Sequence, residues 1–260
     1  MSVAVETLSP VSSFPRALAK LIGFGSLLFA FVVHHSLIVM VVRHKGTRHR
    51  LFLKNIPRYA RSAQRILGMR VLEREVVHAP EASLIVANHL SYLDVLVLAP
   101  LYPALFVTSV EIREMPVLGL VTKLAGCFFV ERRRSRITAG TKQRELAQMR
   151  LELDRGHSVL LFPEGTSSDG AGVLPFKATF FQLATDLALP VIPVCLKYRG
   201  ASSSQAPWYG DMTFLPHLFS ICRTEEIRLT VEELPPIFGS DKFELAAECH
   251  RRIQEAYGRT

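Results

Sequence analysis

The sequence is poor in cysteine and lacks any close pair of cysteines. Its 260 residues include four, at positions 127, 195, 222 and 249, and no C-x-x-C pair occurs. A disulfide framework or a zinc site built on thiolates needs several cysteines at short, regular spacings. The sequence therefore predicts neither, and a reducing compartment is the expected environment.

Several common catalytic signatures are also missing. The chain has no G-x-S-x-G of serine hydrolases, no H-E-x-x-H of zinc proteases and no G-x-G-x-x-G after a predicted strand. The glycines of GTSSDG at 165–170 have the spacing of a phosphate-binding loop, but Ala171 stands where that loop needs lysine. These absences exclude the corresponding enzyme classes and give no indication of a metal or redox cofactor.

Acidic residues are outnumbered, which leaves the chain basic. There are 31 Lys and Arg against 23 Asp and Glu, a formal net charge of +8, and the pI is about 9.6. Such a charge suits a membrane surface or phosphorylated ligands. Nucleic acid would use the same charge, but no motif combining basic and aromatic residues supports it, so nucleic acid is not an expected partner.

One long apolar run lies near the N-terminus. Residues 21–42 contain no formally charged side chain, and the mean hydropathy of the whole chain is +0.23. About 20 apolar residues cross a bilayer, and a cleavable signal peptide would have a shorter apolar region, so we expect one membrane helix. More basic residues follow the run than precede it, which predicts a catalytic domain on the cytoplasmic face.

These patterns divide the chain into three expected parts. Residues 1–50 form the membrane anchor, residues 51–70 a basic amphipathic linker, and residues 71–260 the catalytic domain. The linker alternates basic and apolar residues, which is typical of a segment lying on anionic lipid. A solvated basic linker is the alternative.

Strands and helices alternate through the third part. Runs of β-branched and apolar residues predict seven strands, at 71–77, 84–87, 104–108, 127–130, 159–162, 191–197 and 227–231. Helical patterns cover 137–155, where Gly156 ends the helix, and then 178–187 and 242–257. The predicted fold class is α/β, with a mixed, mainly buried sheet flanked by helices.

The first chemical motif follows the strand at 84–87. Residues 88–94 read NHLSYLD, so His89 lies at the carboxyl end of a buried strand, where α/β sheets place their ligands. Histidine suits general-base catalysis because it titrates near neutral pH. Asp94 could orient the ring if His89 lies in the turn and Asp94 in the first turn of the next helix. Alone, H-x-x-x-x-D is a weak signal among nine histidines.

Three further segments follow predicted strands or form them. Residues 162–166 read FPEGT, which predicts an abrupt turn presenting Glu164 and Thr166 at the edge of the sheet; an ordinary turn with a capping residue is the alternative. Residues 126–132 read GCFFVER and place Arg132 in a basic cluster, where arginine can bind phosphate or belong to a solvated face. Residues 191–194 read VIPV, by themselves only a strand with a bend.

In this order the four segments resemble the glycerolipid acyltransferase superfamily, which contains 1-acylglycerol-3-phosphate acyltransferase. The resemblance covers residues 70–235 and implies a glycerol-3-phosphate acyltransferase-like fold. It implies that His89 is the general base and Asp94 its orienting partner. It assigns the acceptor's phosphate to Arg132. Binding of the glycerol phosphate portion falls to the E-G-T residues, Glu164, Gly165 and Thr166.

The resemblance implies a membrane-bound O-acyltransferase. It would move a fatty acyl group from acyl-CoA or acyl carrier protein to a lysolipid, first 1-acylglycerol-3-phosphate, giving phosphatidic acid for phospholipid biosynthesis. Two departures favour an alternative acceptor, because Ser167 and the Ser109–Val110 pair replace cations found in many members. That alternative is a lyso-aminolipid, such as lyso-ornithine lipid, or another lysophospholipid. A catalytically silent lipid-binding protein is less favoured because the histidine and aspartate are both present.

Overall fold

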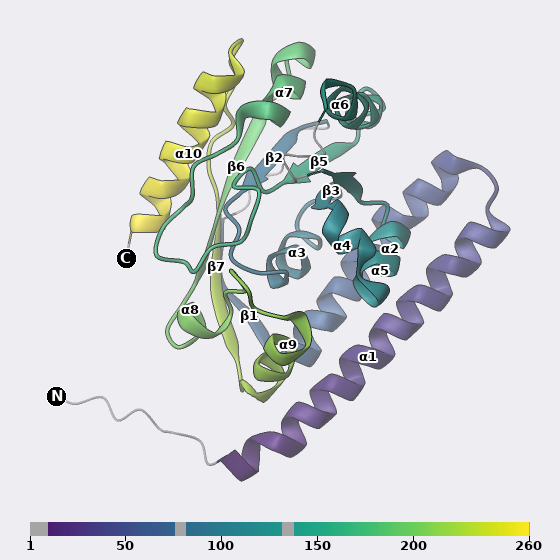
Figure 1. The fold of residues 1–260 in the computed structure, drawn as a ribbon, viewed down its shortest axis with the longest axis vertical. Coiled ribbons are helices and arrows are strands. Elements are labelled where there is room, and N and C mark those ends of the chain that lie inside the picture. Colours follow the sequence, from purple (N-terminus) through teal and green to yellow (C-terminus); the bar gives the residue numbers. More distant parts are fainter. Residues whose placement is uncertain (1–9, 76–81, 132–137, 260) are drawn as a thin grey trace.

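A seven-stranded sheet forms the centre of the molecule (Figure 1). The computed structural model describes residues 10–75, 82–131 and 138–259. The strands follow the order β1-β7-β6-β2-β5-β3-β4. Their bounds are β1 Met69–Glu75, β2 Leu84–Ala87, β3 Ala104–Ser109, β4 Phe128–Val130, β5 Ser158–Leu161, β6 Val191–Tyr198 and β7 Ile227–Glu233.

The sheet is mixed, as the sequence predicts. All neighbouring pairs are parallel except β6 and β7, which run antiparallel. The seven expected strands all form, with described ends that differ from the predicted ones by at most two residues; residues 76 and 77 of the first predicted strand lie outside the described residues. Because β2, β3, β4, β5 and β6 run in one direction, their carboxyl ends meet at one edge of the sheet.

Helices cover both faces of the sheet. Their bounds are α1 Pro10–Val41, α2 Lys45–Leu67, α3 Leu93–Leu98, α4 Val110–Glu114, α5 Pro116–Leu124, α6 Ala139–Leu153, η2 Ala178–Phe181, α7 Gln182–Leu187, α8 Ser202–Gln205, α9 Phe214–Arg223 and α10 Lys242–Gly258. The predicted helices at 137–155, 178–187 and 242–257 correspond to α6, to η2 with α7, and to α10. Gly156 follows α6 at φ +85°, a conformation that glycine adopts without strain.

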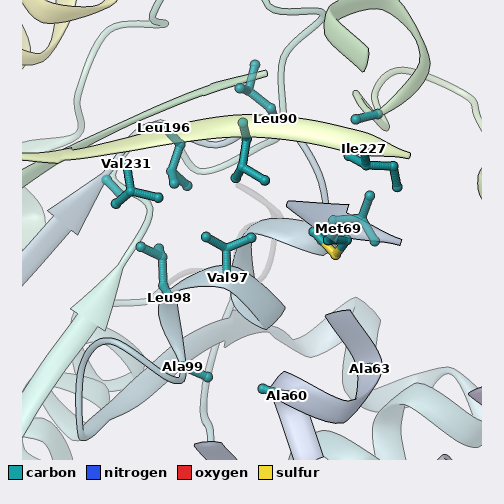
Figure 2. Packing of buried hydrophobic residues seen from close by; sticks show 14 of the residues in the cluster. Ala60, Ala63, Met69, Leu90, Val97, Leu98, Ala99, Leu196, Ile227 and Val231 are labelled. Atoms are coloured by element: carbon teal, nitrogen blue, oxygen red, sulfur yellow. The ribbon is translucent and has the colours of Figure 1, made fainter. Parts of the chain in front are cut away.

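Two apolar clusters divide the core between the faces. One cluster joins the sheet to α1, α2, α3 and α9, and the other joins it to α6, α7 and α10. Figure 2 shows the first cluster, where Ala60 of α2 and Val97 of α3 pack beneath Leu196 of β6. Strands buried on both sides need apolar residues at every position, which explains the continuous apolar run of Leu84–Ala87.

The N-terminal helix is longer than its apolar run. α1 begins at Pro10, whereas the uncharged segment begins at residue 21. The extra turns dock on the domain, because Ala17 is fully buried and the Lys20 ammonium donates hydrogen bonds to the carbonyls of Leu67 and Thr224, both at 2.7 Å. Lys20 therefore ties α1 to the ends of α2 and α9, and is not simply a basic residue flanking a membrane segment.

The segment after the apolar run is a helix. α2 begins after His44, whose Nδ1 accepts the Thr47 N–H, and it ends at Gly68, which has φ +77°. It packs along α1, as Figure 1 shows, and against α3. The predicted boundary between anchor and linker at residues 50–51 falls within α2, and the division into three domains stays a prediction.

Candidate active site

His89 and Asp94 meet in the turn that joins β2 to α3. His89 follows the strand, and Asp94 lies in the first turn of α3, so the five-residue spacing brings the two side chains together. The His89 Nδ1 lies 2.9 Å from Asp94 Oδ2. The backbone N–H groups of Leu90 and Ser91 donate to the same oxygen, at 2.7 and 2.9 Å. One buried carboxylate thus fixes both the turn and the imidazole.

The His89 ring is held in one orientation with its second nitrogen available. A carboxylate only accepts hydrogen bonds, so Nδ1 carries the proton and Nε2 carries the lone pair. The ring stacks on Phe162, with centroids 4.0 Å apart and planes 16° apart. Its side chain is 15% exposed, whereas that of Asp94 is fully buried. This geometry suits a general base that takes a proton at Nε2.

Glu164 lies inside the turn after β5 and binds backbone groups. Its Oε1 accepts the His89 N–H at 2.7 Å, and its Oε2 accepts the Leu174 N–H at 3.2 Å. The Ser168 N–H donates a hydrogen bond to the His89 carbonyl, at 2.9 Å. The carboxylate therefore clamps the FPEGT turn to the turn that carries His89.

Burial perturbs this carboxyl group. Desolvation raises the pKa of Glu164 from 4.5 to about 7, although the two backbone N–H groups that it accepts act in the opposite direction. Its position indicates a structural link between the two motifs; contact with substrate stays a prediction.

Gly165 and Thr166 differ in their surroundings. Gly165 has φ +76°, and a methyl group built on it would lie 2.2 Å from the Lys177 ammonium nitrogen. The positive φ favours glycine here, and the Lys177 side chain lies against the space that a larger residue would fill. Thr166 is exposed, and its roles, like those of Gly165, remain predictions. Arg132 lies outside the described residues.

A cavity of about 190 Å³ opens beside the FPEGT turn, on the α6 side of the sheet. Its apolar lining residues include Phe162, whose ring stacks on His89. Four charged side chains, Glu131, Lys142, Glu145 and Lys177, line it as well. Over the described ranges no group of three or more His, Cys, Asp or Glu side chains is placed to bind a metal ion.

Sequence reasoning missed several residues of this site. Tyr198 of β6 donates to Asp94, and Asn88 bonds to the backbone of Leu196, but neither partner is near in the sequence. Lys142 and Glu145 reach the cavity from α6, three residues apart on one helix face. Only that helical spacing, combined with knowledge of which helix covers the sheet edge, could have indicated them.

Comparison with known proteins identifies relatives along most of the chain. The family profile described as Acyltransferase matches residues 68–197, half of the chain. The lyso-ornithine lipid O-acyltransferase of Pseudomonas aeruginosa is 33% identical over 66% of each chain. The 1-acyl-sn-glycerol-3-phosphate acyltransferase of Neisseria gonorrhoeae is 34% identical over 64% of each. These two matches span slightly less than two thirds of either relative's length.

A human relative and a solved structure match over more of the chain. The human 1-acyl-sn-glycerol-3-phosphate acyltransferase beta is 32% identical over 92% of this chain and 82% of its own. The crystal structure of the 1-acyl-sn-glycerophosphate (LPA) acyltransferase PlsC from Thermotoga maritima superposes with a TM-score of 0.67, covering 95% of this chain and 99% of that one. At 20% identity this likeness concerns the fold alone. From the family profile and the curated relatives, the chain belongs to the acyltransferase family.

Proposed function

We propose that this protein is an O-acyltransferase that moves a fatty acyl group from a thioester donor to the free hydroxyl of a lysolipid. The observation that carries the proposal is the His89–Asp94 pair, whose Nδ1 to Oδ2 distance is 2.9 Å, at the carboxyl edge of the sheet. The family assignment supports the reaction class, since the relatives named above are lysolipid acyltransferases.

The proposed reaction proceeds by direct attack. His89 Nε2 takes the proton of the acceptor hydroxyl while the oxygen attacks the thioester carbonyl carbon. The carbon–sulfur bond then breaks, and the imidazolium proton goes to the departing thiolate. Asp94 stabilises the imidazolium during the step. Burial raises the pKa values of Cys195 and Cys249 to about 12, so neither thiol suits a role as an intermediate acyl carrier.

The first candidate acceptor is 1-acylglycerol-3-phosphate. Its phosphate needs converging cations, and Arg132 is one by family resemblance. Lys177 supplies a second positive charge directly beside Gly165 of the E-G-T segment. This placement supports the idea that Lys177 compensates for the cations replaced at Ser167 and at Ser109. The Ser167 hydroxyl instead donates to the Trp208 carbonyl and ties two loops together.

A lyso-aminolipid is the second candidate acceptor, and one observation favours it. Glu131 and Glu145 line the same cavity as Lys142 and Lys177. A site with both charges suits a head group that carries an amine as well as an anion. One of the relatives named above, from Pseudomonas aeruginosa, is a lyso-ornithine lipid O-acyltransferase.

The donor and the location complete the proposal. Acyl-CoA or acyl carrier protein supplies the thioester, and a basic surface suits either donor. The proposed reaction needs no other cofactor. We place the protein at a membrane because Phe14–Val41 is long and apolar enough to cross one, and because both substrates carry acyl chains. The cytoplasmic face follows from the basic residues after the apolar run.

An acceptor screen tests the proposal. Purified full-length protein is mixed with labelled acyl-CoA or acyl carrier protein and, separately, with lysophosphatidic acid, lyso-ornithine lipid or lysophosphatidylcholine. We expect a labelled diacyl product with lysophosphatidic acid. A stronger signal with lyso-ornithine lipid would select the second candidate. If none of the lysolipids gave a labelled product with either donor, the proposed function would be contradicted.

A further inference from the structure

The strand that contains the VIPV segment reaches the site through its last residue. β6 runs beside β2, and Tyr198 ends it at the same edge of the sheet as His89. The Tyr198 side chain is 4% exposed, and its hydroxyl donates to Asp94 Oδ1 at 2.8 Å. The other oxygen, Oδ2, binds His89 and two backbone N–H groups. Tyr198 is therefore the partner of the carboxylate oxygen that faces away from the imidazole.

β6 also binds the first residue of the turn that carries His89. The Asn88 side-chain amide donates to the Leu196 carbonyl at 2.9 Å, and its oxygen accepts the Leu196 N–H at 2.7 Å. These two bonds continue the β2–β6 pairing by one residue through a side chain. β6 thus fixes the turn at its start through Asn88 and at its carboxylate through Tyr198.

The Tyr198 hydroxyl stays protonated over the pH range of the assay described below. Burial, and after it the neighbouring Asp94 carboxylate, raises the pKa of Tyr198 well above its usual value. A protonated hydroxyl facing a carboxylate has a single role, which is to donate. Asp94 Oδ1 therefore always has a donor while the protein is folded.

We infer that Tyr198 is a positioning residue for acyl transfer, one that orients the Asp94 carboxylate and limits how strongly it holds the imidazolium of His89. The inference rests on the proposed function, because it assigns Tyr198 a part in general-base catalysis. A carboxylate with four donors has its charge spread over all of them. Without the hydroxyl, more of that charge acts on His89, and the imidazolium releases its proton less readily.

The other ionisable groups near the pair are the same residues in the wild type and in Tyr198→Phe. Glu164 and Asp169 approach from the loop after β5, Tyr92 from the start of α3, and Tyr257 from α10. Because the Glu164 carboxyl group titrates near pH 7, the His89 ring signal described below assigns a change in pH dependence to the imidazole.

The test compares two buried tyrosine–carboxylate pairs. Tyr198→Phe removes the bond to Asp94, and Tyr102→Phe removes the 2.7 Å bond from Tyr102 to Glu233, at a similarly buried site away from the turn. The kcat/KM of full-length protein is measured from pH 5.5 to 9. We expect Tyr198→Phe to lower kcat/KM roughly tenfold at pH 7 and by less at pH 9. The acid limb of the profile, which is the fall of kcat/KM at low pH, should move to higher pH. Tyr102→Phe should keep the wild-type limb.

A second replacement keeps the inference testable if Tyr198→Phe does not fold. Introducing 3-fluorotyrosine at position 198 makes the hydroxyl a stronger donor, and should move the acid limb to lower pH. A loss that is equal at every pH, or an unmoved limb in either variant, would overturn the inference.

A titration read by NMR separates this inference from the proposed function. The His89 ring signal, identified by its loss in His89→Ala, should titrate at higher pH in Tyr198→Phe than in the wild type. This readout needs no turnover, so it holds even if the wild type transfers no acyl group. An unchanged His89 titration would overturn the inference on its own.

Discussion

At the residue scale, His89 and Asp94 differ in how much of the fold depends on them. The His89 side chain has one described hydrogen bond and is partly exposed, whereas the buried Asp94 carboxylate accepts four hydrogen bonds. Removing His89 takes away the base alone. Removing Asp94 also leaves two backbone N–H groups and a tyrosine hydroxyl without their acceptor.

We therefore expect the two alanine variants to separate chemistry from stability. His89→Ala should lower kcat at least ~100-fold, the scale of a general base, with a melting temperature close to that of the wild type. Asp94→Ala should lose similar activity and melt clearly lower, because each buried donor without a partner costs about 1–3 kcal/mol. Steady-state kinetics with thermal unfolding in the same detergent check both. Equal melting temperatures for the two variants would contradict this distinction.

Glu164 predicts a pH dependence of stability. A carboxyl group whose pKa is raised on folding favours the folded state at low pH, and that contribution is lost as pH rises from 4.5 to about 7. The change is on the order of 3 kcal/mol in the free energy of unfolding. Glu164→Gln cannot ionise, so its stability should fall less over this window. The free energy of unfolding of both proteins is measured between pH 4.5 and 7.5. The same slope against pH in both would contradict this role of Glu164.

At the element scale, the sequence predicted the strands better than the helices. Strands such as Ser158–Leu161 are short, apolar and bounded by turn residues, so local pattern identifies them. α4 and α5 are short helices separated only by Met115, and α2 reads as a basic segment because its apolar face is recognisable only against α1. Such helices depend on tertiary packing more than on local propensity.

The exposed side of α1 is the surface that we expect to meet lipid. Phe29, on this helix, is 72% exposed, although a phenylalanine normally avoids water. Phe29→Lys should lower the fraction of protein bound to anionic vesicles severalfold, because a charged side chain is costly in the bilayer. Leu151→Lys is the matched control: Leu151 lies on α6, is 55% exposed, and gains the same charge. Equal vesicle binding by both variants would place the α1 surface outside the lipid.

At the scale of the whole molecule, the turn that carries His89 lies at the edge of the sheet, between two faces that are covered by different helices. The apolar α1 and the basic, amphipathic α2 pack on one face, and the charged cavity opens on the face covered by α6. A lysolipid with its acyl chain towards α1 and its head group towards the cavity would present its hydroxyl near His89. Sequence motifs placed His89 and Glu164 at this edge. They could not place Lys177, since that depends on how the chain returns after the FPEGT turn.

Lys177 tests the head-group end of this arrangement. Lys177→Ala should raise the KM for lysophosphatidic acid about tenfold and change kcat less, because in the proposed site the cation would bind the phosphate both before and during the reaction. The KM for the acyl donor should stay the same. Lys242→Ala, on α10 with its ammonium over the Phe243 ring, is the control and should leave both values unchanged. A Lys177 variant with an unchanged acceptor KM would remove this residue from the site.

The most direct test of the account is thiol release from the acyl donor, measured with and without lysolipid, for the wild type and for His89→Ala. Acyl transfer by a general base predicts release that requires the lysolipid, matches the diacyl product one to one, and falls at least ~100-fold in the variant. Release without lysolipid would indicate hydrolysis instead of transfer. Wild-type release by His89→Ala would contradict the role of His89, and with it the proposed mechanism.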